Sequence, residues 1–114
     1  MARLRETPSQ TAGPYVHIGT VPTFAGLEGV YPEDPGAGPL YREGVRGEPI
    51  TITGRVLDGM DAPVRDVVVE IWHADADGLY PSPAETRGRA DPAFRGWGRS
   101  AAYGEEGAFR FETI

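Results

Sequence analysis

Tyrosine and histidine are the side chains of this sequence that could take part in metal chemistry. They are five tyrosines and two histidines: Tyr15, Tyr31, Tyr41, Tyr80 and Tyr103, with His17 and His73. A phenolate is a hard anionic ligand that suits Fe(III). Tyr80 follows an acidic turn at 75–78, where a side chain can leave the core and face a site. Spacing alone favours a simpler interpretation, in which the ring covers the core and the hydroxyl meets water.

No other motif indicates a specific chemistry. Asp75-Ala76-Asp77-Gly78 resembles the start of a calcium loop, but Thr86 stands where the twelfth position needs a bidentate acid. Two acids before a glycine are more typical of a turn, so we predict a turn. Neither histidine has a second His or Cys at zinc-ligand spacing. The residue types therefore predict no catalytic set within this chain alone.

Composition narrows the class of protein. The 114 residues allow one small domain, and the absence of cysteine excludes disulfide scaffolds, iron–sulfur clusters and thiol catalysis. A net charge of −6 makes the chain a poor candidate for binding nucleic acid. The longest aliphatic run, Val67–Val69, is far too short to span a membrane. We expect a cytoplasmic protein that binds neither nucleic acid nor membrane.

The chain divides near residue 48. Residues 1–48 hold eight glycines and six prolines without a sustained period, so we predict an extended N-terminal arm followed by Gly/Pro-rich loops. Within it, Tyr15–Ile18 is predicted to be a short extended piece because Pro14 precedes it. A run of turns from Val21 to Gly47 is unusually long for a compact domain. It is expected to be either disordered or laid over another surface.

Residues 49–114 are predicted to form β-structure. Alternation predicts strands at 50–57 and 64–72, joined as an antiparallel hairpin by a six-residue turn, and a last strand at 107–114. The stretch from Pro81 to Gly98 is predicted to be loop. Three or four strands would make one sheet rather than two. The all-β fold expected is therefore the first half of an antiparallel sandwich, completed by a partner or by a missing C-terminal half.

Two segments resemble a known family. WHADADGLY (Trp72–Tyr80), within Thr53–Tyr80, and the segment Pro92–Ile114 are similar to the first half of the intradiol ring-cleavage dioxygenases. TPSQTAGPYVHIG (Thr7–Gly19) resembles the opening of the alpha chains of those family members that cleave protocatechuate. The resemblance implies an antiparallel β-sandwich and a hetero-oligomer. It also implies O2-dependent cleavage of protocatechuate to 3-carboxy-cis,cis-muconate.

The resemblance also implies where the metal lies. The family holds nonheme Fe(III) with two tyrosines and two histidines, and the first of those tyrosines falls on Tyr80. The second tyrosine and the His-x-His pair belong to the family's second half, and no histidine follows His73 here. Tyr80 is therefore expected to be vestigial, with Fe(III) in a homologous beta chain. A dimer that uses Tyr80 and His73 as ligands is a weaker alternative.

The same resemblance assigns substrate binding to the arm, at Thr11, Gly13, Pro14 and Tyr15. The two hydroxyl groups could donate to the substrate carboxylate, while glycine permits close approach and proline stiffens the segment. The same residues could instead dock an arm on a partner surface. A second alternative is a non-enzymatic carrier or adhesion module, since Gly54–Ile71 also resembles the start of domains found beside carboxypeptidases. That alternative leaves the arm unexplained.

Overall fold

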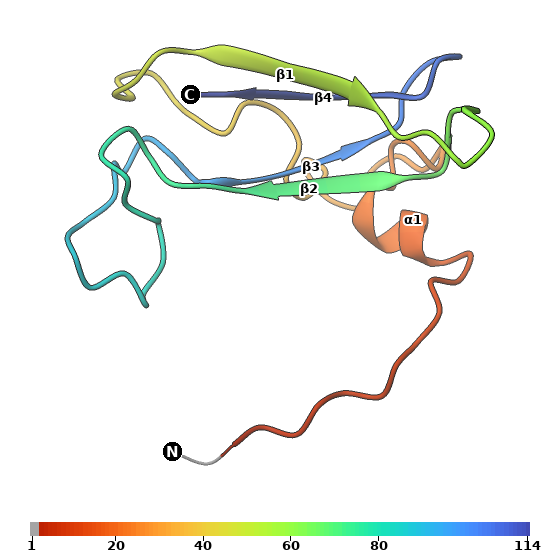
Figure 1. The fold of residues 1–114 in the computed structure, drawn as a ribbon, viewed down its shortest axis with the longest axis horizontal. Helices are drawn as coiled ribbons and strands as arrows, with labels where there is room; N and C mark the ends of the chain where they lie inside the picture. Colours follow the sequence, from red (N-terminus) through yellow and green to blue (C-terminus); the bar gives the residue numbers. More distant parts are fainter. Residues whose placement is uncertain (1–2) are drawn as a thin grey trace.

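The computed structural model describes residues 3–114, which form one short helix and four strands (Figure 1). Their bounds are α1 at Val16–Thr20, β1 at Ile50–Arg55, β2 at Val68–Trp72, β3 at Trp97–Ala101 and β4 at Ala108–Thr113. No helix in the described part of the chain is both long and apolar enough to cross a membrane.

The strands form two antiparallel layers. β1 pairs with β4, with Ile50 opposite Thr113, and β2 pairs with β3, with Val68 opposite Ala101. Figure 1 shows the β1–β4 pair lying over the β2–β3 pair. The all-β, antiparallel sandwich prediction is confirmed, whereas the expectation of a single sheet is wrong.

The predicted hairpin between the strands at 50–57 and 64–72 is also wrong. Its turn does form, because Val64 N–H donates to the Val56 carbonyl at 2.8 Å and Asp58 N–H donates to the Ala62 carbonyl at 2.9 Å. Beyond the bridge between Leu57 and Pro63 the two segments separate, one into each layer. Local turn chemistry was correctly inferred, but strand partners depend on packing between distant segments.

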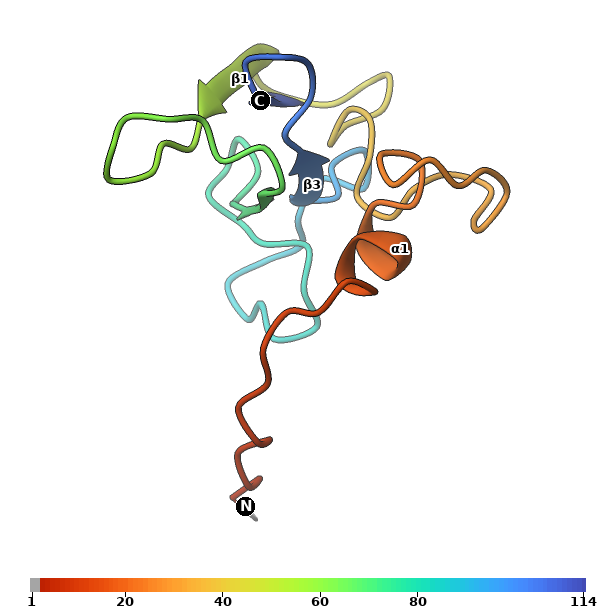
Figure 2. The same ribbon diagram turned by 90° about the vertical axis from the view of Figure 1, so that its right-hand side faces the viewer.

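The N-terminal region forms a helix where an extended piece was predicted. Gly19 N–H donates to the Tyr15 carbonyl at 3.2 Å, and the Thr20 hydroxyl donates to the Val16 carbonyl at 2.6 Å. These local bonds make one helical turn despite Pro14, whose fixed φ also suits the start of a helix. Residues 3–14 then lead away from the body as an extended arm in both views (Figures 1 and 2).

The core lies between the layers and includes part of the predicted loop region. Leu40, Phe94 and Phe111 are the buried residues of this core. Leu40 N–H donates to the Glu112 carbonyl and the Leu40 carbonyl accepts from Arg95 N–H, both at 2.9 Å. The loop around Leu40 thus connects the two layers. Of the two outcomes expected for residues 21–47, this part is laid over another surface.

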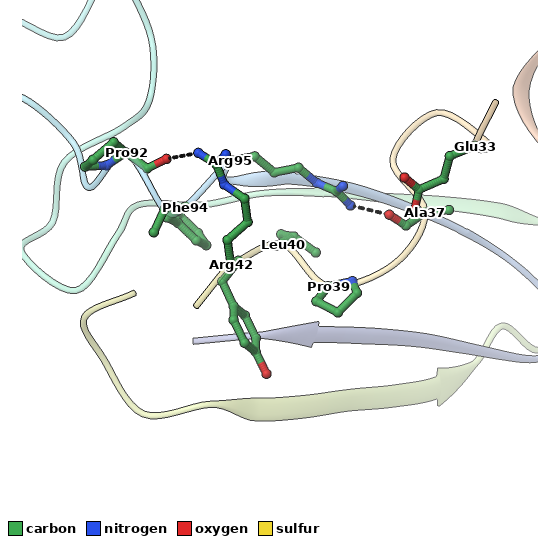
Figure 3. Close-up of a pocket in the computed structure, with 10 residues that line it drawn as sticks. Glu33, Ala37, Pro39, Leu40, Arg42, Pro92, Phe94 and Arg95 are labelled. Atoms are coloured by element: carbon green, nitrogen blue, oxygen red, sulfur yellow. Dashed lines mark hydrogen bonds between the residues drawn. The ribbon is translucent and has the colours of Figure 1, made fainter. Parts of the chain in front are cut away.

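The side chain of Arg95 holds this loop in place. Its guanidinium donates to the carbonyl groups of Gly36, Ala37 and Gly38, at 2.9, 2.8 and 3.2 Å. Figure 3 shows the Arg95 side chain reaching Ala37 beside Leu40 and Pro39. Burial lowers the pKa of Arg95 from its usual value, against the opposing effect of Glu33. The Arg95 guanidinium therefore holds in place the backbone at Gly36–Gly38, which belongs to neither strand pair.

β3 was missed because its sequence, WGRSA, lacks apolar alternation. Gly98 provides the room for Leu40, since an added Cβ would lie 2.7 Å from Leu40 Cδ1 and 3.3 Å from Phe111 Cδ1. We expect Gly98→Ala to lower the free energy of unfolding by roughly 1–3 kcal/mol through overpacking. Gly59→Ala is the matched control, because nothing lies within 4 Å of its added Cβ. Chemical denaturation of both variants tests this, and equal midpoints would contradict it.

One apolar region is open to solvent. Ile50, Ile52 and Trp72 are 45%, 39% and 50% exposed. With Ile71 and Ile114 they line a groove of about 490 Å³ between the β1–β4 and β2–β3 pairs. The isoleucine face of β1 is therefore uncovered in this chain.

Candidate functional site

The four residues predicted to bind substrate lie together at the base of the arm. Thr11, Gly13, Pro14 and Tyr15 are all exposed, and Tyr15 is 80% exposed. Val16 N–H donates to the Gly13 carbonyl at 3.1 Å, which bends the chain just before α1. Within residues 3–114, neither the Thr11 nor the Tyr15 hydroxyl makes a hydrogen bond, so both could donate to a group outside this chain.

A hollow lies beside the base of the arm. Gly13 and Pro14 line it together with Asp66 and Val68 from the start of β2, and its volume is about 520 Å³. An added Cβ on Gly13 would meet nothing within 4 Å. This chain therefore does not itself require glycine at that position.

Analysis of the sequence missed the contact that joins α1 to β2. His17 Nε2 lies 2.7 Å from the Asp66 carbonyl oxygen. The His17 ring also packs against Phe24, with centroids 5.9 Å apart, and Phe24 meets Tyr103 edge-on at 5.7 Å. No local pattern could reveal the contact, because the acceptor is a backbone carbonyl 49 residues along the chain.

Tyr80 lies at the other end of β2. Its ring packs against Trp72 with centroids 5.5 Å apart, and the residue is 36% exposed. Tyr80 N–H donates to Glu85 Oε2 at 3.1 Å, which ties the backbone to the following loop. Tyr80 therefore packs on a half-exposed tryptophan rather than on the core of Leu40, Phe94 and Phe111.

His73 is not available as a ligand in this conformation. Its Nδ1 lies 2.8 Å from the Ala74 carbonyl oxygen, which can only accept, so Nδ1 carries the proton. Its Nε2 lies 2.6 Å from the Thr113 hydroxyl, which donates to it in the neutral ring. Both nitrogens are therefore occupied, and the alternative that pairs Tyr80 with His73 has no support.

The donor set in this chain does not fit an iron centre. No group of three or more His, Cys, Asp or Glu residues within 3–114 is arranged to hold a metal ion. Tyr80 packs on Trp72, and His73 is engaged at both nitrogens. No catalytic step through a metal is derived from these residues.

The acidic segment after β2 forms the predicted turn. Asp75 Oδ1 accepts hydrogen bonds from the N–H groups of Asp77 and Leu79, both at 2.9 Å. Gly78 N–H donates to the Asp75 carbonyl at 3.0 Å. The predicted turn is confirmed. This turn sets the position of Tyr80, the next residue after Leu79.

A second aspartate extends this turn into a network. Asp75 Oδ2 accepts from Asp91 N–H at 2.7 Å, and Asp91 in turn accepts from the N–H groups of Arg46 and Ala93, both at 2.9 Å. The Arg46 side chain also pairs with Asp77. Three distant segments are thereby joined around two buried carboxylates, Asp75 and Asp91, each 6% exposed.

Both buried carboxyls have pKa values below the usual range. Burial acts to raise the pKa of Asp75, but hydrogen bonds from Asp91, Leu79 and Asp77 outweigh it. Hydrogen bonds from Arg46 and Ala93 lower the pKa of Asp91. The ionised forms are therefore the ones that the fold stabilises.

This network predicts a specific loss of stability in acid. A carboxyl whose folded pKa is lowered contributes its full stability above its unfolded pKa, which is about 4 for an aspartate. That contribution is lost as the pH falls from there through the lower folded pKa values. We expect a nearly constant free energy of unfolding between neutral pH and about pH 5, then a steep fall below about pH 4. Denaturation at a series of pH values tests this, with Asp75→Asn as the variant whose profile should be flatter.

Comparison with known proteins places these features in a family. A model of the dioxygenase family matches residues 32–114. The chain also resembles the crystal structure of 3-chlorocatechol 1,2-dioxygenase from Rhodococcus opacus, with a TM-score of 0.52 and 30% identity, over 77% of this chain and 36% of that one. The chain belongs to the intradiol dioxygenase family.

Curated relatives of this dioxygenase chain include both subunit types. The protocatechuate 3,4-dioxygenase alpha chain of Pseudomonas putida is 39% identical over 97% of this chain and 52% of its own length. The beta chain of Burkholderia cepacia is 45% identical over 60% of this chain and 29% of its own length. The chain spans about half the length of the alpha chains it matches. The resemblance to an intradiol dioxygenase alpha chain is confirmed.

Proposed function

We propose that this chain is the non-iron alpha subunit of a cytoplasmic protocatechuate-cleaving dioxygenase. In this proposal a homologous beta chain holds Fe(III), and the two chains form a hetero-oligomer. The enzyme takes protocatechuate and O2 to 3-carboxy-cis,cis-muconate, and this chain helps to bind the aromatic acid. The alpha chain's N-terminal residues Thr11, Gly13, Pro14 and Tyr15 would face the partner's pocket.

One observation carries the proposal. The arm, which lies inside the 97% of the chain matched by the alpha relative, is exposed, and the hydroxyl groups of Thr11 and Tyr15 bond to nothing in the described chain. Arms of this kind are costly to order unless a partner receives them.

The chemistry of the arm suits a carboxylated ring. Hydroxyl groups of Thr11 and Tyr15 can each donate to a carboxylate oxygen, and such charge-assisted bonds are stronger than neutral ones. Pro14 limits the freedom that binding would remove. Orientation of the ring by its carboxylate is the contribution expected of this chain to turnover.

The open groove suggests how the sandwich is completed. β1 and β2 each have one unpaired edge, and the apolar side chains between them are half exposed. Burial of the Trp72, Ile50 and Ile52 side chains would contribute several kcal/mol at about 25 cal/mol per Å². We propose that the homologous beta chain covers this groove in the working enzyme.

Coexpression with an iron-carrying beta chain tests the proposal. The copurified complex should consume one O2 per protocatechuate, with the absorbance of the muconate product appearing at the same rate. The isolated chain should do neither. Failure of the two chains to associate, or an associated complex without turnover, would refute the proposed function.

Tyr15→Phe tests the assigned contact to the carboxylate. Because one charge-assisted hydrogen bond is lost, we expect KM for protocatechuate to rise by about tenfold or more. Catechol is the matched substrate, since it lacks the carboxylate and should show little change. Steady-state kinetics on both substrates decide the matter. An equal change for both substrates would show that Tyr15 does not recognise the carboxylate.

A further inference from the structure

We infer that His17 is a positioning residue, which fixes the direction in which α1 presents the substrate-binding arm. The inference deepens the proposed function and rests on it. The substrate-binding residues themselves do not bind the body of the chain, so something else must set their direction. His17, two residues after Tyr15, reaches the backbone carbonyl of Asp66 in the turn that precedes β2.

The helix that carries the arm cannot hold its own direction. α1 has five residues, and no side chain caps its first turn. An isolated turn of helix is unstable in water, so its orientation depends on contacts with the body. Two such contacts come from opposite ends. Arg99 donates to the Thr20 carbonyl at 3.1 Å at the far end, and His17 meets the Asp66 carbonyl at 2.7 Å on the side of the arm.

The two contacts differ in what they can control. Arg99 is itself held by Glu70, with its Nε 2.7 Å from Glu70 Oε1, so the end of α1 at Thr20 is tied to β2 and β3. The Tyr31 hydroxyl also donates to the Gly19 carbonyl at 3.0 Å, so two bonds hold this end of the helix. Attachment at this end alone would leave the start of α1 free to pivot. The His17 contact is the attachment on the side of the arm, and His17 lines the same hollow as Gly13 and Pro14. It therefore determines where the hydroxyls of Thr11 and Tyr15 are directed.

The hydrogen-bonding role of the His17 Nε2 atom follows from its partner. A carbonyl oxygen can only accept, so the Nε2 atom of His17 must carry a hydrogen and donate it. Glutamine places an amide donor at a similar distance from the backbone, whereas alanine offers none. His17→Gln and His17→Ala therefore separate the loss of the donor from the loss of the ring.

The test uses the complex of this chain with its iron-carrying partner. His17→Ala should raise KM for protocatechuate by about three- to tenfold, the range expected for one lost hydrogen bond, and leave kcat nearly unchanged. His17→Gln should restore most of the affinity. KM for catechol should move much less in either variant. Ile18→Ala, an exposed neighbour on α1, is the control for helix perturbation and should leave KM within about twofold.

Amide hydrogen exchange of the peptide covering residues 13–20 supplies a readout that does not need turnover. His17→Ala should speed exchange there by about three- to tenfold and His17→Gln should not. A wild-type complex without turnover would refute the proposed function while the exchange measurement still tests His17. Unchanged KM and exchange in His17→Ala would overturn this inference with the proposed function intact. Equal effects of the two His17 variants would overturn it as well, because they would assign the effect to the ring.

Discussion

Removal of residues 1–15 should lower kcat/KM of the assembled enzyme for protocatechuate by about a hundredfold or more. Two charge-assisted donors, Thr11 and Tyr15, would be lost together, and each is worth roughly tenfold. The fold should survive, because residues 3–15 are exposed and contribute nothing to the core of Leu40, Phe94 and Phe111. Steady-state kinetics measures the loss, and the unfolding midpoint checks that the body is intact.

A shorter deletion is the matched control. Removal of residues 1–8 takes away more than half of the arm but leaves Thr11, Gly13, Pro14 and Tyr15 in place. We expect kcat/KM to stay within about threefold of the full chain, since no proposed substrate contact is lost. If both deletions leave turnover unchanged, the arm has no part in substrate binding. If both abolish assembly with the beta chain, the arm is a docking segment instead.

Asp75→Ala should cause the largest loss of stability of any single substitution outside the apolar core. The change leaves the N–H groups of Asp77, Leu79 and Asp91 without their acceptor. The Asp91 N–H is buried, and a buried donor left unsatisfied costs about 1–3 kcal/mol; the other two are partly buried and cost less, because water can reach them. We expect the free energy of unfolding to fall by roughly 2 kcal/mol or more, measured by denaturant titration.

Asp77→Ala is the control for that substitution. Asp77 is a neighbouring carboxylate whose side chain is 48% exposed and pairs with Arg46 at the surface. Exposed ion pairs contribute about 0–1 kcal/mol, so this variant should lose little stability. Equal losses for the two variants would mean that the buried network does not hold the turn. In the assembled enzyme Asp75→Ala should also loosen the loop that carries Tyr80.

The sequence predicted those elements whose signals are local. Alternation located the strands at 50–55 and 108–113, and the chemistry of Asp75 and Gly78 located the turn after β2. β3 was not predicted from the sequence, because its Gly98 makes room for Leu40 and gives no strand signal of its own. The helix at 16–20 was not predicted, because five residues are too few to show a helical repeat of apolar residues. In each case the missing information lies in a contact with a distant segment.

Strand pairing shows the same limit. The turn between Leu57 and Pro63 was correctly placed, yet the strands it joins enter different layers. What separates them is the loop of Leu40, which hydrogen-bonds to both Glu112 and Arg95 and fills the space between the layers. That loop was expected only as a run of turns. A buried leucine in a glycine- and proline-rich segment gives no periodic signal.

For the candidate site, the sequence predicted which residues belong to it but not the contact that joins α1 to the rest of the chain. The resemblance pointed to Thr11, Gly13, Pro14 and Tyr15, and the structure places all four in one exposed stretch beside α1. Their role in binding stays a prediction, because the group they would contact lies outside this chain. His17 was recognised only as a lone histidine, since its acceptor is a backbone carbonyl. A hydrogen bond from a side chain to a distant backbone carbonyl cannot be predicted from the pattern of side chains.

The central claim is that this chain assists an iron site that it does not itself contain. Iron analysis of the isolated chain, of the complex with the beta chain, and of the complex carrying Tyr80→Phe tests the claim most directly. We predict no bound iron on the isolated chain, and the same iron content per beta chain in both complexes. Stoichiometric iron on the isolated chain, or loss of iron from the Tyr80→Phe complex, would contradict the account.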